Sequence, residues 1–174
     1  MQTYNELVAE IRAEFPEFTI RPKAESRFMR VLGAIFSVLS GSAFMREYTT
    51  TLGYAVLTPE GWDGWDEPRR IIVLRHERVH MRQARRYGRL WFSIAYLLFP
   101  LPFGLAYARA RFEWEAYRES LRARVDLYGP ESLTVEYREF IISQFVGPAY
   151  LWMWPFRATV RRWYDAALKD LFSR

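Results

Sequence analysis

The chain has 174 residues, of which 51% are hydrophobic and 26% are charged, and its formal net charge is +5. This balance is typical of a globular protein and excludes a largely disordered chain, and the length predicts one domain over residues 1–174. The absence of cysteine excludes disulfide bonds and thiolate metal sites, so a bound metal ion would need nitrogen and oxygen ligands.

The N-terminal third of the chain predicts two helices followed by a strand. The first stretch is apolar on one side, which predicts an amphipathic helix rather than a signal peptide, and Pro16 predicts its end. Residues 28–45 are largely apolar and predict a buried helix. Residues 48–58 are rich in β-branched and aromatic side chains and predict a strand, in which Gly53 marks a bulge or a turn.

The best-defined predicted helix begins after Asp66 and ends before Gly88. Asp66 is a suitable N-cap, Pro68 suits the first turn, and Gly88 suits the C-terminal cap. Further helices are predicted at about 107–128, at about 132–145 and up to about 172. A short β region ahead of these helices predicts an α+β, predominantly helical fold.

Both histidines of the chain fall in one short motif within the helix predicted between Asp66 and Gly88, His76-Glu77-Arg78-Val79-His80. Residues four apart on a helix project from the same face, so the two imidazoles can bind a single zinc ion. Glu77 then lies beside a zinc-activated water, where it can act as a general base. The motif therefore predicts a Zn²⁺ site with His76 and His80 as ligands and Glu77 as the catalytic residue.

A third protein ligand is needed, because catalytic zinc takes three protein ligands and leaves one position for water. Without further histidine or cysteine it must be a carboxylate, and the predicted helix at 107–128 supplies Glu113, Glu115 and Glu119. A helix displays Glu113 and Glu115 about 200° apart, so only one of these two can face the metal.

The pattern His76-Glu-x-x-His80 followed by Glu113-x-x-Ala-Tyr117 resembles the gluzincin branch of the zincin metallopeptidases, over roughly residues 48–120. The resemblance implies a zincin-like fold with a small β-sheet preceding the active-site helix. It also implies that Glu113 is the third zinc ligand and that the protein hydrolyses peptide bonds in peptide or protein substrates. An aspartate of the family pattern is replaced by Tyr117, which leaves a histidine without a carboxylate partner.

The stretch Leu90–Ala108 carries no charge and lies between Arg89 and Arg109. A straight membrane span would place His80 and the glutamate helix on opposite sides of a bilayer about 30 Å thick, which is incompatible with a shared zinc ion. The break at residues 100–102 instead predicts a hairpin. We expect this hairpin to be packed as core in a cytoplasmic protein, and the alternative is peripheral contact with a membrane surface.

Several features of the mechanism stay open at this point. Tyr137, Tyr150, Tyr164 and the arginines are candidates for the donor that stabilises the oxyanion. The strand at 48–58 is a candidate for binding an extended substrate. The alternative function is a catalytically idle zinc-binding or membrane-surface scaffold. Nucleic-acid binding is not expected, because the arginines are dispersed among glutamates.

Overall fold

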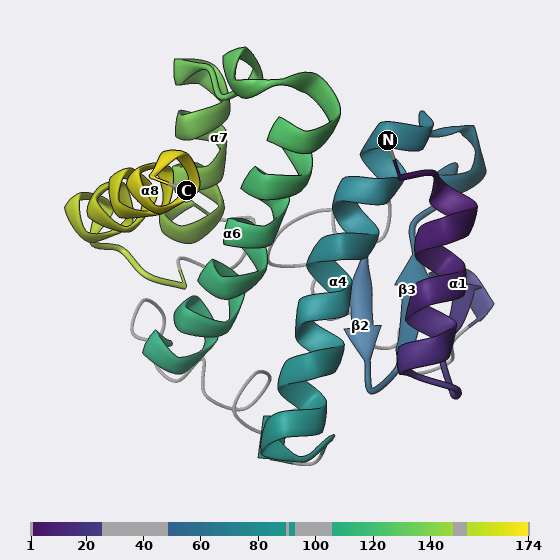
Figure 1. Cartoon of the computed structure of the whole chain (residues 1–174). Helices are drawn as coiled ribbons and strands as arrows, with labels where there is room; N and C mark the ends of the chain where they lie inside the picture. The colour runs from purple at the N-terminus through teal and green to yellow at the C-terminus, as the bar shows by residue number, and fades with distance from the viewer. Residues whose placement is uncertain (1, 26–48, 90, 93–105, 148–152, 174) are drawn as a thin grey trace.

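The computed structural model describes residues 2–25, 49–89, 91–92, 106–147 and 153–173 (Figure 1). The helices are α1 (Tyr4–Glu14), α4 (Glu67–Tyr87), α6 (Tyr107–Tyr128), α7 (Val135–Val146) and α8 (Arg157–Phe172), and the strands are β1 (Thr19–Pro22), β2 (Thr50–Leu52) and β3 (Ala55–Thr58). Short 3₁₀ helices span Lys23–Glu25, Trp62–Gly64 and Pro130–Ser132. The predicted α+β, predominantly helical class is confirmed. The helix predicted at 28–45 lies outside the described residues.

The sheet has three strands in the order β1-β3-β2, with β1 parallel and β2 antiparallel to β3. The β structure predicted at residues 48–58 is confirmed, but it forms two strands rather than one, β2 and β3 of a hairpin. Gly53 has a φ of 64° and makes the turn between them, a conformation that glycine adopts without strain. Strand β1 was not predicted, since it is short and its partner is distant in the sequence.

The N-terminal half packs α1 and α4 against one face of this sheet (Figure 1). The buried apolar side chains of this core come from α1, β3 and α4 and from the loops beside them: Leu7, Val8, Ile11, Phe15, Phe18, Val56, Trp62, Ile71, Leu74 and Met81. At its edge Glu14 accepts hydrogen bonds from Arg78, Arg82 and Arg85 at 2.8–3.0 Å. The Arg82 hydrogen bond is the main reason that the pKa of Glu14 falls to about 2. These contacts hold α1 along α4.

The C-terminal half is a helical layer in which α7 and α8 pack against α6 (Figure 1). Its buried side chains include Trp114, Leu121, Ile141, Ile142, Phe145, Val160 and Tyr164. Helix α7 begins later than the predicted residue 132, because Pro130–Ser132 forms a 3₁₀ turn and the Thr134 side chain caps α7 by accepting from the Tyr137 amide. The bounds of α6 and the end of α8 agree with the predictions.

Helices α4 and α6 lie side by side and join the two halves (Figure 1). Arg75 links them by donating to Glu119 and Asp126 at distances of 2.6–2.7 Å. The apolar residues 93–105, which include most of the predicted hairpin, lie outside the described residues. No helix in the described ranges is both long enough and apolar enough to cross a membrane.

Candidate metal centre

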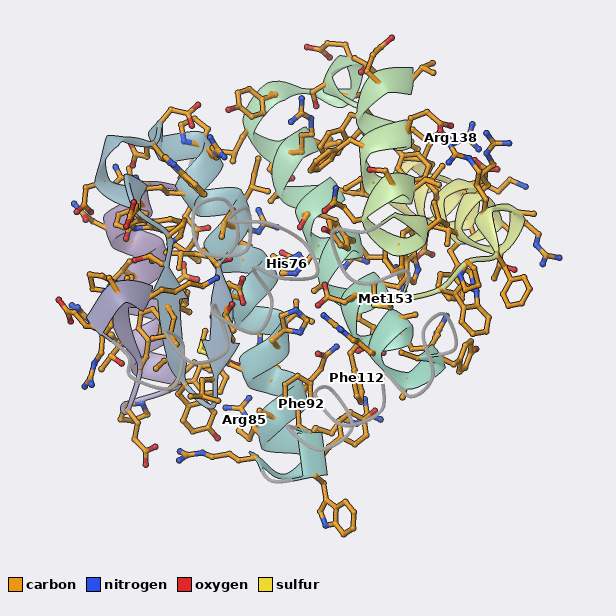
Figure 2. The ribbon with its side chains drawn as sticks, turned by 180° about the vertical axis from the view of Figure 1, so that it is seen from behind. His76, Arg85, Phe92, Phe112, Arg138 and Met153 are labelled. Atoms are coloured by element: carbon orange, nitrogen blue, oxygen red, sulfur yellow. The ribbon has the colours of Figure 1, made fainter. Side chains whose placement is uncertain are left out.

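Helix α4 turns His76 and His80 toward α6, as Figure 2 shows for His76. The two residues are one turn apart, and their Nε2 atoms are 3.2 Å from each other. His80 is buried and His76 is partly buried. The motif read from the sequence therefore presents two imidazole nitrogens to one point between the helices.

Helix α6 contributes Glu113, which is only 1% exposed. One oxygen of its carboxylate is 3.4 Å from His76 Nε2 and the other is 3.6 Å from His80 Nε2. Ligands at about 2.0–2.1 Å from a tetrahedral zinc ion are separated by about 3.3 Å, so the spacing of these atoms suits such an ion. His76, His80 and Glu113 could together hold a metal ion, since one ligand atom of each lies within 4.8 Å of the others.

The other two acidic candidates of α6 do not join this group. Glu115 accepts a hydrogen bond from Gln83 Nε2 at 2.9 Å. Glu119 is paired with Arg75 and, at 3.6 Å, with Arg122. Among the glutamates that the sequence left open, Glu113 is therefore the one that the fold brings to the histidines.

The charges within this group are strongly coupled. Burial alone would lower the pKa of His80, but the Glu113 carboxylate, with smaller contributions from Glu77 and Gln83, raises it to about 9. The imidazoles correspondingly hold the pKa of Glu113 well below its ordinary value, although burial opposes this. Without a metal ion, the cluster therefore keeps a proton on His80 at neutral pH. A metal ion binding there must displace that proton.

Both imidazoles have hydrogen-bond partners at Nδ1, so their Nε2 atoms face the cluster. His80 Nδ1 is 2.9 Å from Gln83 Oε1, and His76 Nδ1 is 3.1 Å from the Ser120 hydroxyl. Gln83 Nε2 donates to the Phe112 carbonyl, which leaves Oε1 as an acceptor. Ser120 donates to the Ala116 carbonyl and so accepts from His76. These partners assign the proton to Nδ1 of each ring, which leaves Nε2 as the natural metal-binding atom.

Tyr117 contacts His76 by packing rather than by charge. Its ring is buried and meets the His76 imidazole edge-on, with centroids 4.9 Å apart. On the other side of the cluster Phe92 lies 6.1 Å from the His80 ring and packs on Phe112 (Figure 2). Each histidine ring therefore has an aromatic neighbour.

Glu77 is buried and turns toward the sheet. One oxygen of its carboxylate accepts a short hydrogen bond from the Thr49 hydroxyl, and the other accepts from Thr51 of β2 at 2.6 Å. Lys23 is buried nearby; burial lowers the pKa of its ammonium to about 8, although the Glu77 charge opposes this shift. The sequence indicated Glu77 but gave no sign of these three neighbours.

A cleft with a volume of about 380 Å³ opens onto His76 and Glu77 between α4, α6 and α7. Its α7 wall is formed by Tyr137, Phe140 and Gln144, which recur at helical spacing on one face. Of the candidate oxyanion donors, Tyr137 and the arginines Arg69 and Arg124 line this cleft. Tyr164 is instead buried in the C-terminal core, and Tyr150 lies outside the described residues.

Two of the residues that sequence reasoning missed carry a local signal. Gln83 lies about one turn beyond His80 on α4, and Ser120 lies two turns beyond Glu113 on α6. Each therefore lies on the same helix face as the candidate ligand before it. The chain was also compared with family models, curated proteins and solved structures, and none of them matches it.

Proposed function

We propose that the protein is a zinc-dependent metallopeptidase of the gluzincin type, in which His76, His80 and Glu113 hold Zn²⁺ and Glu77 is the general base. The observation that carries the proposal is that two imidazoles of one helix meet a carboxylate of another, with one ligand atom of each residue within 4.8 Å of the others. The imidazole-rich donor set suits zinc better than magnesium or calcium, which favour oxygen ligands.

Zinc bound there would lower the pKa of a coordinated water and polarise a substrate carbonyl. Glu77 follows His76 directly and lines the same cleft, so it can accept the proton of the attacking water and later pass it to the leaving amine. Thr49 and Thr51 fix the orientation of its carboxylate. Tyr137, which lines the cleft, is the favoured donor to the developing oxyanion.

A peptide is the substrate class that best suits the surroundings of this site. Strand β2 pairs with β3 on one side and is an edge of the sheet within the described residues. An edge strand can add an extended peptide through main-chain hydrogen bonds. The cleft beyond β2 has aromatic walls that can accept a side chain of such a peptide.

The proposal is tested by metal analysis and hydrolysis of a fluorescently labelled casein, with wild type, Glu113→Gln, Glu115→Gln and Glu77→Gln measured together. We expect one zinc per chain in wild type, Glu115→Gln and Glu77→Gln, and strongly reduced zinc in Glu113→Gln. Hydrolysis should be lost in Glu113→Gln and Glu77→Gln and retained in Glu115→Gln, which is the matched control. Equal zinc content in the two variants Glu113→Gln and Glu115→Gln would contradict the proposed ligand set.

A second candidate is a zinc-binding protein without catalysis. The specific observation in its favour is that both oxygens of Glu77 already accept hydrogen bonds from threonine hydroxyls. Wild-type protein that retains one zinc per chain but hydrolyses no casein would favour this candidate over the peptidase.

The peripheral membrane contact of residues 90–108 also stays a proposal. Its support lies at the two ends of the stretch, where the Trp91 and Tyr107 side chains are 70% and 52% exposed. Flotation with anionic liposomes tests it, and we expect weaker flotation for the double variant Trp91→Ser and Tyr107→Ser than for wild type.

A further inference from the structure

Two arginines from different helices line the cleft beside the candidate metal ligands, Arg69 of α4 and Arg124 of α6. The Arg69 guanidinium lies over the Trp65 ring, 3.7 Å from its centroid. The Arg124 guanidinium lies over the Tyr137 ring, 4.0 Å from its centroid. Stacking on an aromatic ring fixes a guanidinium while leaving N–H groups at its edge for other partners.

Neither arginine forms an ion pair with a carboxylate of the described residues. Arg124 donates its Nε to the Ser132 carbonyl at 3.0 Å, and within the described residues its terminal N–H groups have no hydrogen-bond acceptor. By contrast, Arg75 and Arg78 of α4, which line a different cleft, each have two carboxylate partners. An arginine pair that is oriented but lacks a carboxylate is a ready site for one.

The acidic side chains in the cleft do not neutralise this pair. Glu77 is held at the metal end by Thr49 and Thr51. Asp66 lies at the far end, where it accepts from the Tyr128 hydroxyl at 3.4 Å. Among the described residues, that far end therefore holds two cations and one anion, which favours an anionic ligand.

The two arginines lie at the same end of the cleft because α4 and α6 run antiparallel, as the pairing of Gln83 with Phe112 and of Asp66 with Tyr128 requires. Arg69 is two turns, about 10 Å, from His76 along α4. Arg124 is one turn, about 6 Å, from Ser120, which contacts His76. An extended peptide advances about 3.3 Å per residue, so these distances correspond to two or three residues.

We propose that Arg69 and Arg124 bind a substrate carboxylate two or three residues from the scissile bond, so that the preferred substrates are peptides with an acidic side chain or a free C-terminus at that position. This inference rests on the proposed peptidase function, but the arginine site can be measured as binding alone. A carboxylate held by two guanidinium groups should bind at least about tenfold more tightly than its neutral isostere.

The test is calorimetric binding of four N-acetylated pentapeptides to the zinc-loaded Glu77→Gln protein, with wild type assayed in parallel for cleavage. The first two probes are pentaalanine with a free C-terminus and its amide. The other two are pentaalanine amides with glutamate or glutamine as the last residue. Each is measured again on a background carrying Arg69→Gln, Arg124→Gln or both, with Arg122→Gln as the matched control from the same helix outside this cleft.

We expect peptides with the carboxylate to bind about tenfold or more tightly than their neutral counterparts. This preference should fall toward unity in the double variant, persist in Arg122→Gln and weaken with salt. A preference for the free C-terminus over its amide identifies the α-carboxylate, and a preference for glutamate over glutamine identifies a side chain. Equal binding of all four peptides, or no binding of any, overturns the inference. Acid-selective binding without cleavage by wild type would contradict the peptidase proposal alone, and cleavage without charge preference would contradict the arginine site alone.

Discussion

Zinc affinity should depend steeply on pH, because the metal-free cluster holds a proton on His80. The Glu113 carboxylate overcomes the effect of burial and raises the pKa of His80 to about 9. A group whose folded-state pKa is raised keeps its proton until the pH passes that value. Zinc must displace this proton, so its affinity is highest above pH 9 and falls as the pH decreases.

The size of the effect follows from the pKa. Between pH 8 and pH 6, competition from a proton with a pKa of about 9 should weaken zinc binding about 90-fold, or about 2.7 kcal/mol. An ordinary histidine with a pKa of about 6.5 would weaken it only about fourfold over the same range. At pH 7, zinc binding should release about one proton per zinc ion if the histidine pKa is about 9. It should release about a quarter of a proton if the pKa is about 6.5.

Competition with a chelating indicator of known pH dependence measures the affinity, and calorimetry in two buffers of different ionisation enthalpy counts the protons. An NMR titration of the zinc-free protein gives an independent check, since the chain contains only two histidines. We expect one imidazole to titrate near pH 9, and its midpoint to fall in Glu113→Gln. A fourfold affinity change together with an unshifted midpoint in Glu113→Gln would refute the proposed coupling between Glu113 and His80.

The remaining predictions concern the partners of the site and the stability of the two halves. Ser120→Ala should weaken zinc binding about 10–100-fold, as loss of a hydrogen-bond partner behind a ligand does, while Ser143→Ala, an exposed control, should not. Glu14→Gln should cost about 1 kcal/mol and lower the Tm by about 2–4 °C at neutral pH. The difference in Tm between wild type and Glu14→Gln should vanish as the pH falls from 4.5 toward 2, because wild-type Glu14 becomes protonated there. Leu121→Ala should cost about 2–5 kcal/mol, or about 4–20 °C in Tm, because this side chain is only 1% exposed. Thermal unfolding followed by circular dichroism measures both stability effects, and an unchanged Tm would contradict either.

The helices could be predicted well from the sequence because their signals are local. Pro68, Gly88 and Gly129 mark helix ends, and the last two have φ values of 84° and 82° that favour glycine. The sheet was harder to predict for a physical reason. Strand β1 pairs with β3 across more than thirty intervening residues, and no periodicity within four residues reveals such a partner.

The candidate site, like the fold, depends partly on local sequence signals and partly on contacts between distant segments. The spacing of His76, Glu77 and His80 within one helix was sufficient to predict that the imidazoles share a face. The choice between Glu113 and Glu115 depends on how α6 is rotated against α4, and that rotation is set by packing in the C-terminal core rather than by α6 alone.

The neighbours of Glu77 are the least predictable part of the site, and they bear most directly on its chemistry. Thr49, Thr51 and Lys23 come from the hairpin and from the 3₁₀ turn after β1, and only the folded sheet brings them to α4. A carboxylate with a hydroxyl donor at each oxygen and a buried ammonium nearby is held in one orientation. The motif on α4 therefore sets the positions of His76, Glu77 and His80 along the helix, while Thr49, Thr51 and Lys23 hold the Glu77 carboxylate in one direction. Variants of Thr49 and Thr51 that leave zinc bound but change the rate of hydrolysis would separate these two contributions.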